Sequence, residues 1–128
     1  MNKKGFTLIE LMIVVVILAS LAAMIVPRIM GRADDAKRNI ARGEIQSITT
    51  ALKLYKLDNG LYPSSQEGLS VLLSPENGRE PYLDKIKDPW KREYRYKYKG
   101  VHNTSGFDIW SLGPDENDDS DNVNNWED

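Results

Sequence analysis

The stretch from Lys4 to Val26, KGFTLIELMIVVVILASLAAMIV, decides how the rest of this chain is arranged. From Phe6 onward it is apolar apart from Thr7, Glu10 and Ser20. At about 1.5 Å per residue, a helix over this run would reach roughly 30 Å, the thickness of the hydrocarbon core of a bilayer. The run therefore predicts a membrane-spanning helix, and the lysines before it favour a cytoplasmic N-terminus.

A secretory signal peptide is the alternative interpretation of this run, because it has a basic start and the small residues Ser20 and Ala22 as a cleavage pattern. Glu10 argues against it, since an ordinary signal peptide has no use for a carboxylate there. A carboxylate at the edge of the bilayer core costs roughly 2.5–3.5 kcal/mol unless it is neutralised or paired. Two interpretations of Glu10 stay open: its side chain reaches the interface, or a partner charge meets it during assembly.

The whole chain has 128 residues, one histidine and no cysteine, which is enough for one domain with a modest core. The lack of cysteine excludes disulfides, thiol nucleophiles and cysteine-based zinc sites. The formal net charge is −2, but the segment from Gly113 to Asp128 holds seven acids and no base, while the rest carries +5. No nucleophile–base pair, phosphate loop or histidine metal set appears, so we do not expect an enzyme.

Helical periodicity continues well beyond the apolar run. The apolar residues recur along one stripe of an amphipathic helix, at Ile45, Ile48, Leu52 and Tyr55. The sequence Asp58-Asn59-Gly60 is typical of a helix end. We therefore expect one helix from about Phe6 to Asp58. Pro27 and Gly31 predict a kink or a locally unwound stretch within it, which is either a blemish in the monomer or a segment that melts in a filament.

A short second helix is expected to hold Leu69, Val71, Leu72 and Leu73, because Ser64 and Glu67 ahead of it have the spacing of a capping box. The following loop has Tyr82 and Leu83 as its expected anchors to the core.

Two strands are expected in the C-terminal half. Tyr94, Tyr96 and Tyr98 alternate with Arg95, Lys97 and Lys99, the period of a strand with one packed face. Residues 107–112 predict a second strand. The fold class is therefore α+β, with a long N-terminal helix packed against a small antiparallel sheet. Because the cations occupy the solvated face of a packed strand, we expect no nucleic-acid partner.

The acidic run Asp115–Asn122 has two interpretations. One is a solvated tail, and the other is a folded loop that returns to the sheet, which the apolar residues before and after it favour. A folded loop with this many carboxylates would repel itself without a cation, and such oxygens are the ligands that Ca²⁺ takes. An EF-hand is excluded, because Ser120 stands where glycine is needed and Trp126 where the bidentate glutamate belongs.

The motif Lys4–Glu10 followed by an apolar run resembles the class III signal of type IV pilins and pseudopilins. The resemblance implies that a prepilin peptidase cuts after Gly5 and that the new N-terminal residue, Phe6, is N-methylated. It further implies that Glu10 pairs with the Phe6 amine of a neighbouring subunit in a filament. Such a pair relieves the desolvation of both groups only when subunits meet.

The second half of the chain resembles the major pseudopilins of type II secretion systems. The resemblance lies in the segments Gly60–Leu69, Asp88–Trp90, Asp108–Asp115 and Asn125-Trp126. It implies a type IV pilin-like fold with a leader peptide at residues 1–5, a transmembrane and filament-core half-helix at 6–27, and a periplasmic globular domain at 28–128. The lack of a C-terminal cysteine pair favours a pseudopilin over a type IV pilus major pilin.

This resemblance implies a structural subunit anchored in the inner membrane that polymerises into a helical pseudopilus. Its partners would be copies of itself, minor pseudopilins, the inner-membrane assembly platform and the prepilin peptidase. The alternatives are a type IV pilus subunit with the same processing, and a secreted calcium-binding module with a discarded signal peptide.

The resemblance also implies a structural Ca²⁺ in the C-terminal loop. Carried over to this sequence, the ligands are the Leu112 carbonyl, Asp115, Asp121 and Asn122. Asn122 is a departure, since the family usually has aspartate there, and its amide oxygen carries no charge. Asp118, Asp119 and the Ser120 carbonyl are further candidates.

Overall fold

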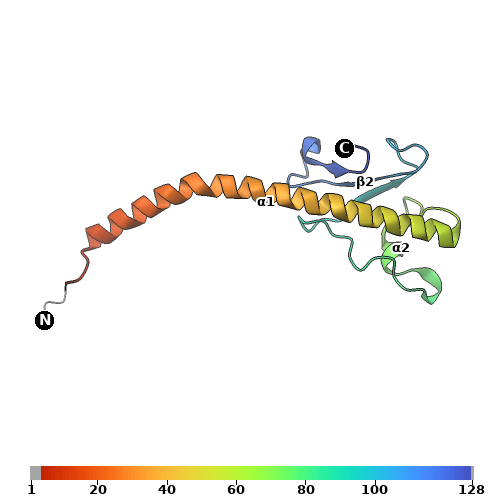
Figure 1. The fold of residues 1–128 in the computed structure, drawn as a ribbon, viewed down its shortest axis with the longest axis horizontal. Helices are drawn as coiled ribbons and strands as arrows, with labels where there is room; N and C mark the ends of the chain where they lie inside the picture. The colour runs from red at the N-terminus through yellow and green to blue at the C-terminus, as the bar shows by residue number, and fades with distance from the viewer. Residues whose placement is uncertain (1–3, 128) are drawn as a thin grey trace. The chain divides into compact units, whose positions relative to one another are not determined.

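The structure, a computed structural model, describes residues 4–127. In chain order its elements are α1 (Leu8–Asn59), α2 (Ser70–Leu73), the 3₁₀ turn η1 (Glu76–Gly78), β1 (Arg95–Tyr98), β2 (Phe107–Ser111), the 3₁₀ turn η2 (Asp119–Asp121) and β3 (Val123–Asn124) (Figure 1). The chain divides into two compact units, and the boundary between Asp35 and Ala36 lies inside α1.

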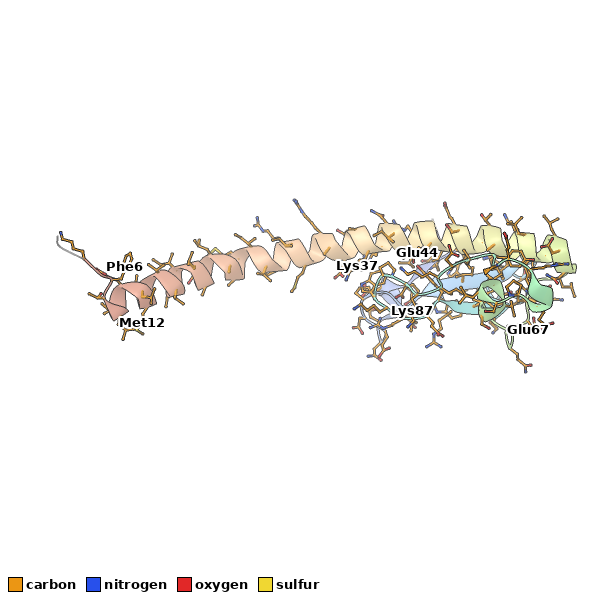
Figure 2. The ribbon with its side chains drawn as sticks, turned by 90° about the horizontal axis from the view of Figure 1, so that it is seen from below. Phe6, Met12, Lys37, Glu44, Glu67 and Lys87 are labelled. Carbon is orange, nitrogen blue, oxygen red and sulfur yellow. The ribbon has the colours of Figure 1, made fainter. Side chains whose placement is uncertain are left out.

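The first unit contains the apolar part of α1. Its large apolar side chains are exposed on all sides, and Figure 2 shows the side chains around Met12 projecting outward from the helix. A window of 18 residues has a mean hydropathy of 2.8, and none of it is buried. The helix is therefore long and apolar enough to cross a membrane. Its exposed apolar surface is stable only when lipid or protein covers it.

The helix expected from about Phe6 to Asp58 runs from Leu8 to Asn59, and Thr7 caps its start. Pro27 and Gly31 both lie inside α1, so the chain is not unwound at these residues in the single subunit, and melting of this stretch in a filament stays a prediction. Proline has no N–H to donate to the carbonyl four residues earlier, but the loss of one bond does not interrupt the helix here.

The second unit begins at Ala36 and buries the expected stripe of α1. Ile45, Ile48 and Leu52 are almost fully buried, and Tyr55 packs at the edge of the same core. The opposite side of this core comes from α2 and the sheet, with Leu72, Phe107, Ile109 and Val123 as members. Figure 1 shows β2 running beside this part of α1. The predicted packing of the helix against a small sheet is thus confirmed.

The sheet is antiparallel, with the strand order β1–β2–β3. Tyr96 pairs with Ile109 in the first ladder, and Ser111 pairs with Val123 in the second. The sequence predicted the first two strands but not β3. That strand is only two residues long, and its pairing with β2 rather than its own sequence pattern makes it a strand.

Tyr94, Tyr96 and Tyr98 lie on the packed side, as their alternation predicted, although β1 itself begins at Arg95. The hydroxyl of Tyr94 donates to Glu44 Oε2 at 2.5 Å, and that of Tyr96 donates to the Pro63 carbonyl at 2.7 Å. Burial raises the pKa of both hydroxyls, so they remain protonated donors. Arg95 and Lys97 are exposed.

The segment between α1 and the sheet also follows the sequence signals. The Ser64 N–H donates to Glu67 Oε2 at 3.2 Å, and the Glu67 N–H donates to Ser64 Oγ at 3.1 Å, which is the predicted capping box. It closes a turn, and the four-residue helix α2 follows at Ser70. Tyr82 and Leu83 pack against the core and bond through their N–H groups to the Leu72 carbonyl, so the predicted anchors are confirmed.

Candidate functional site

The candidate processing segment lies just before α1. Lys4 to Thr7 have no regular secondary structure, and Phe6 is 90% exposed. The Thr7 N–H donates to Glu10 Oε2 at 3.0 Å, and the Glu10 N–H donates to Thr7 Oγ1 at 3.2 Å. This reciprocal pair is a capping box at the N-terminus of the helix. The helix starts at Leu8, so Phe6 and Thr7 separate it from the peptide bond between Gly5 and Phe6. The bond predicted to be cut therefore lies outside the helix, where it is accessible.

Thr7 is a functional residue that the sequence reasoning missed. The signal was present, because Thr7 and Glu10 have the same spacing as Ser64 and Glu67. Glu10 is thus the second half of a helix cap as well as the predicted partner for a neighbouring amine. The predicted leader also includes Met1 to Lys3, which lie outside the described residues.

The second candidate site is the C-terminal acidic loop, and its backbone folds back onto the sheet. Val123 is buried in β3, and the Asn125 N–H donates to the Ile109 carbonyl at 3.1 Å. The Asn125 side chain adds bonds to the Ile109 N–H at 3.0 Å and the Phe107 carbonyl at 3.1 Å. The run is therefore a loop with two fixed ends, as its apolar brackets predicted, and the solvated-tail interpretation is wrong.

The start of this loop is fixed by a buried carboxylate. Asp88 Oδ2 accepts the Ser111 hydroxyl at 2.6 Å, and Ser111 Oγ accepts the Gly113 N–H at 3.1 Å. Asp88 Oδ1 also accepts the N–H groups of Trp90 at 3.0 Å and Arg92 at 2.8 Å. Arg92 in turn donates from Nη1 to the Gly113 carbonyl at 2.5 Å. The Asp88–Trp90 motif thus holds the end of β2, from which the loop leaves.

The end of the loop lies against its start. Because Ser111 pairs with Val123 in an antiparallel register, Leu112 and Asn122 are neighbours. Gly113 has a φ of +70°, and a Cβ at this position would lie 2.3 Å from the Asp121 carbonyl oxygen. Only glycine therefore fits this close approach. Three of the predicted calcium ligands, Leu112, Asp121 and Asn122, are brought together by this pairing.

The other predicted ligands are engaged in local turns. Asp115 is exposed, and its Oδ1 accepts the Asn117 N–H at 3.0 Å. Asp118 Oδ1 accepts the Ser120 hydroxyl at 2.6 Å and its N–H at 3.0 Å, and these two bonds hold the pKa of Asp118 below its usual value. Asp119 accepts a long contact from Asn122 Nδ2 at 3.5 Å. Among residues 4–127, no group of three or more acidic, histidine or cysteine side chains converges as a ready metal site.

The side-chain oxygen of Asn122 nevertheless has the properties of a cation ligand. Asn122 Oδ1 is buried and has no hydrogen-bond donor within the described part of the chain. A buried amide oxygen without a donor is costly, and a cation is one partner that would satisfy it. Asn122 carries no charge, so the fit of this chain to Ca²⁺ depends on its amide oxygen together with Asp121 and the Leu112 carbonyl.

The comparisons with known proteins cover both parts of the chain. A family model described as type II secretion system protein G matches residues 28–126, and a model of the prokaryotic N-terminal methylation motif matches residues 1–26. The type II secretion system core protein G of Pseudomonas aeruginosa is 42% identical, covering 98% of this chain and 96% of the relative. The protein of the same name from Klebsiella pneumoniae is 38% identical, with coverage of 98% and 95%.

A solved structure agrees with these sequence matches. It is the crystal structure of the major pseudopilin from the type 2 secretion system of enterohaemorrhagic Escherichia coli, with a TM-score of 0.65 and 31% identity. The match covers 76% of this chain and 88% of that chain. Together with the match of residues 28–126 to the family model, this likeness shows that the chain belongs to the protein G family of type II secretion systems, the major pseudopilins.

Proposed function

We propose that this chain is the structural subunit that polymerises into the pseudopilus of a type II secretion system and so supports the export of folded proteins across the outer membrane. The observation that carries this proposal is the apolar part of α1, whose side chains are exposed on every side in one chain. A helix of this kind needs lipid before assembly and other copies of itself afterwards, because water would leave a large apolar surface uncovered.

Processing precedes assembly in this proposal. A prepilin peptidase cuts between Gly5 and Phe6, and the new Phe6 amine is then methylated. Two features support this processing: the exposed, non-helical segment before Leu8 and the match of residues 1–26 to the methylation motif. Cleavage also removes Lys3 and Lys4, which leaves an acidic chain with one terminal amine close to Glu10.

Glu10 supplies the charge that sets the register of the filament. Its carboxylate accepts the Thr7 N–H within one chain, and it pairs with the Phe6 amine of a neighbouring subunit when two helices meet. Each charge offsets the desolvation penalty of the other in the apolar surroundings of the packed helices. The pair therefore favours one axial offset between subunits. The remaining partners are the minor pseudopilins and the inner-membrane platform. The globular unit lies in the periplasm, with the N-terminus on the cytoplasmic side.

A structural Ca²⁺ belongs to the same proposal. The Leu112 carbonyl, Asp121 and Asn122 would hold it, with Asp115 joining them from the start of the loop. The unpartnered Asn122 Oδ1 and the closeness of Gly113 to Asp121 support this assignment. When bound, the ion neutralises crowded carboxylates and links the two ends of the loop, so that its binding free energy adds to the stability of the fold.

The experiment that tests the function is a deletion of the gene in its own host, followed by complementation. We expect the deletion to stop the secretion of folded exoproteins into the medium and to leave surface motility unchanged. Loss of motility with normal secretion would instead indicate a type IV pilus subunit and would contradict the proposal.

A further inference from the structure

Arg38 on α1 contacts the end of the acidic loop. Its Nη2 lies 2.7 Å from Asp121 Oδ1, although the two residues are 83 positions apart in the sequence. Both side chains are largely covered, with exposed fractions of 34% for Arg38 and 25% for Asp121. This ion pair therefore joins the helix to the carboxylate that we assign to the metal.

The ion pair between Arg38 and Asp121 leaves polar atoms without partners, which favours replacement of the guanidinium by another cation. The contact given for the guanidinium with Asp121 is a single N–O bond, and Arg38 Nε is buried without a partner within residues 4–127. A bidentate arrangement would have used two nitrogens and held the carboxylate more strongly. The adjacent Asn122 Oδ1 also lacks a donor. One buried donor on Arg38 and one buried acceptor on the residue that follows Asp121 thus remain unsatisfied among the described residues.

A divalent cation would change this balance. A cation bound by Asp121 and Asn122 satisfies the amide oxygen and competes for the carboxylate whose Oδ1 Arg38 now contacts. It also repels the guanidinium, because two positive centres would share one partly covered carboxylate. Arg38 and the metal therefore cannot both hold Asp121 at full strength.

We propose that Arg38 is an internal counter-ion that holds the C-terminal loop on α1 in the metal-free chain and competes with a divalent cation for Asp121. The inference rests on the calcium site proposed above. Its consequence is that Arg38 keeps the loop folded before metal uptake and lowers the affinity for the metal, and that metal binding frees the guanidinium.

The test compares Arg38→Gln with the wild type, using the full chain in detergent micelles and Ca²⁺ alone as the ligand. Isothermal titration gives the dissociation constant, and thermal unfolding is measured with chelator and with saturating calcium. We expect Arg38→Gln to bind calcium about threefold to tenfold more tightly, because the competitor is gone. Without calcium we expect its melting temperature to fall by about 2–6 °C, because the ion pair is lost.

Two controls separate competition from general charge and from misfolding. Arg42→Gln removes the same charge one turn further along α1, where Arg42 is exposed and contacts Asn39, and we expect wild-type affinity and stability. Arg38→Lys keeps a cation near Asp121, and we expect its affinity to stay within about twofold of the wild type. Far-UV circular dichroism checks that each variant keeps its helix.

The outcomes are distinguishable. If the folded Arg38→Gln variant binds calcium no more tightly than the wild type, competition is wrong while the calcium site stands. If Arg42→Gln tightens binding equally, the effect is one of net charge and the specific pair is wrong. If the wild type binds no calcium, the proposed metal site fails, and this inference fails with it.

Discussion

Asp108 is a buried carboxylate near the start of β2, and it accepts the N–H groups of Val101, His102 and Asn103 at 2.7, 3.0 and 2.9 Å. Gly100 leaves room for it, since a Cβ there would lie 2.4 Å from Asp108 Oδ1. Burial alone would raise the pKa of Asp108, but the three backbone donors outweigh it and hold the pKa below its usual value. One side chain thus shapes the turn between β1 and β2.

A substitution at Asp108 should reveal this contribution through its pH dependence. The folded-state pKa is below the unfolded one, so the stabilisation is present above about pH 4 and is lost as the pH falls through the folded-state pKa. We expect Asp108→Asn to lower the free energy of unfolding by about 1–3 kcal/mol at pH 7. Urea denaturation of the full chain in detergent measures it, with the exposed Asp84→Asn as the control.

The difference between Asp108→Asn and the wild type should shrink as the pH is lowered below 4, because the native carboxylate then becomes neutral too. A difference that stays constant or grows on acidification would show that the charge of Asp108 contributes nothing.

Glu10 has two roles that one substitution separates. Glutamine also accepts the Thr7 N–H in a capping box, but it has no charge to pair with an amine. We therefore expect Glu10→Gln to keep the helix start and the cleavage after Gly5 while reducing filament assembly strongly. Electron microscopy of filaments and gel analysis of the cleaved chain measure the two effects. Filaments at the wild-type level would show that charge pairing does not set the register.

At the scale of elements, the acidic loop carries the calcium proposal. Calcium should raise the melting temperature of the wild-type chain, because the ion binds the folded loop and not the unfolded one. We expect Asp115→Ala to abolish this rise. Glu116→Ala removes the same charge from the adjacent exposed residue and should keep the rise. An unchanged calcium response in Asp115→Ala would remove Asp115 from the ligand set.

Elements with a strong internal pattern were predictable from the sequence. The stripe of Ile45, Ile48 and Leu52 has the period of a helix, and the alternation around Tyr96 has the period of a strand, so each indicates its own buried face. The C-terminal end of α1 lies at Asn59, as Asp58-Asn59-Gly60 indicated, and its start was less predictable. Thr7 moves its start to Leu8, and the helix continues through Pro27 because the proline removes only one hydrogen bond.

The parts that could not be predicted are those made by distant residues. Val123 and Asn124 become a strand only by pairing with β2, and the ion pair of Arg38 with Asp121 joins two ends of the globular unit. The acidic composition of the loop indicated a cation, but it did not show which carboxylate already has an arginine beside it. Such contacts depend on the fold as a whole and leave no periodic signal in the sequence.

At the scale of the whole molecule, the chain combines an apolar helix that one copy cannot cover with a globular unit that has a core of its own. This combination is expected of a filament subunit that is anchored in a membrane before it assembles. The globular unit has its own folded core, while the exposed helix supplies the surface for assembly. A secreted module would have no use for this helix after cleavage of its signal.

In the function proposed here, Phe6 begins the mature chain and the apolar helix stays attached to the globular unit. Mass spectrometry of the chain purified from membranes of a host with a prepilin peptidase tests it most directly. We expect a mature protein that lacks residues 1–5 and carries one methyl group on the Phe6 amine. A mature chain that begins near Ala23, without the apolar helix, would contradict it.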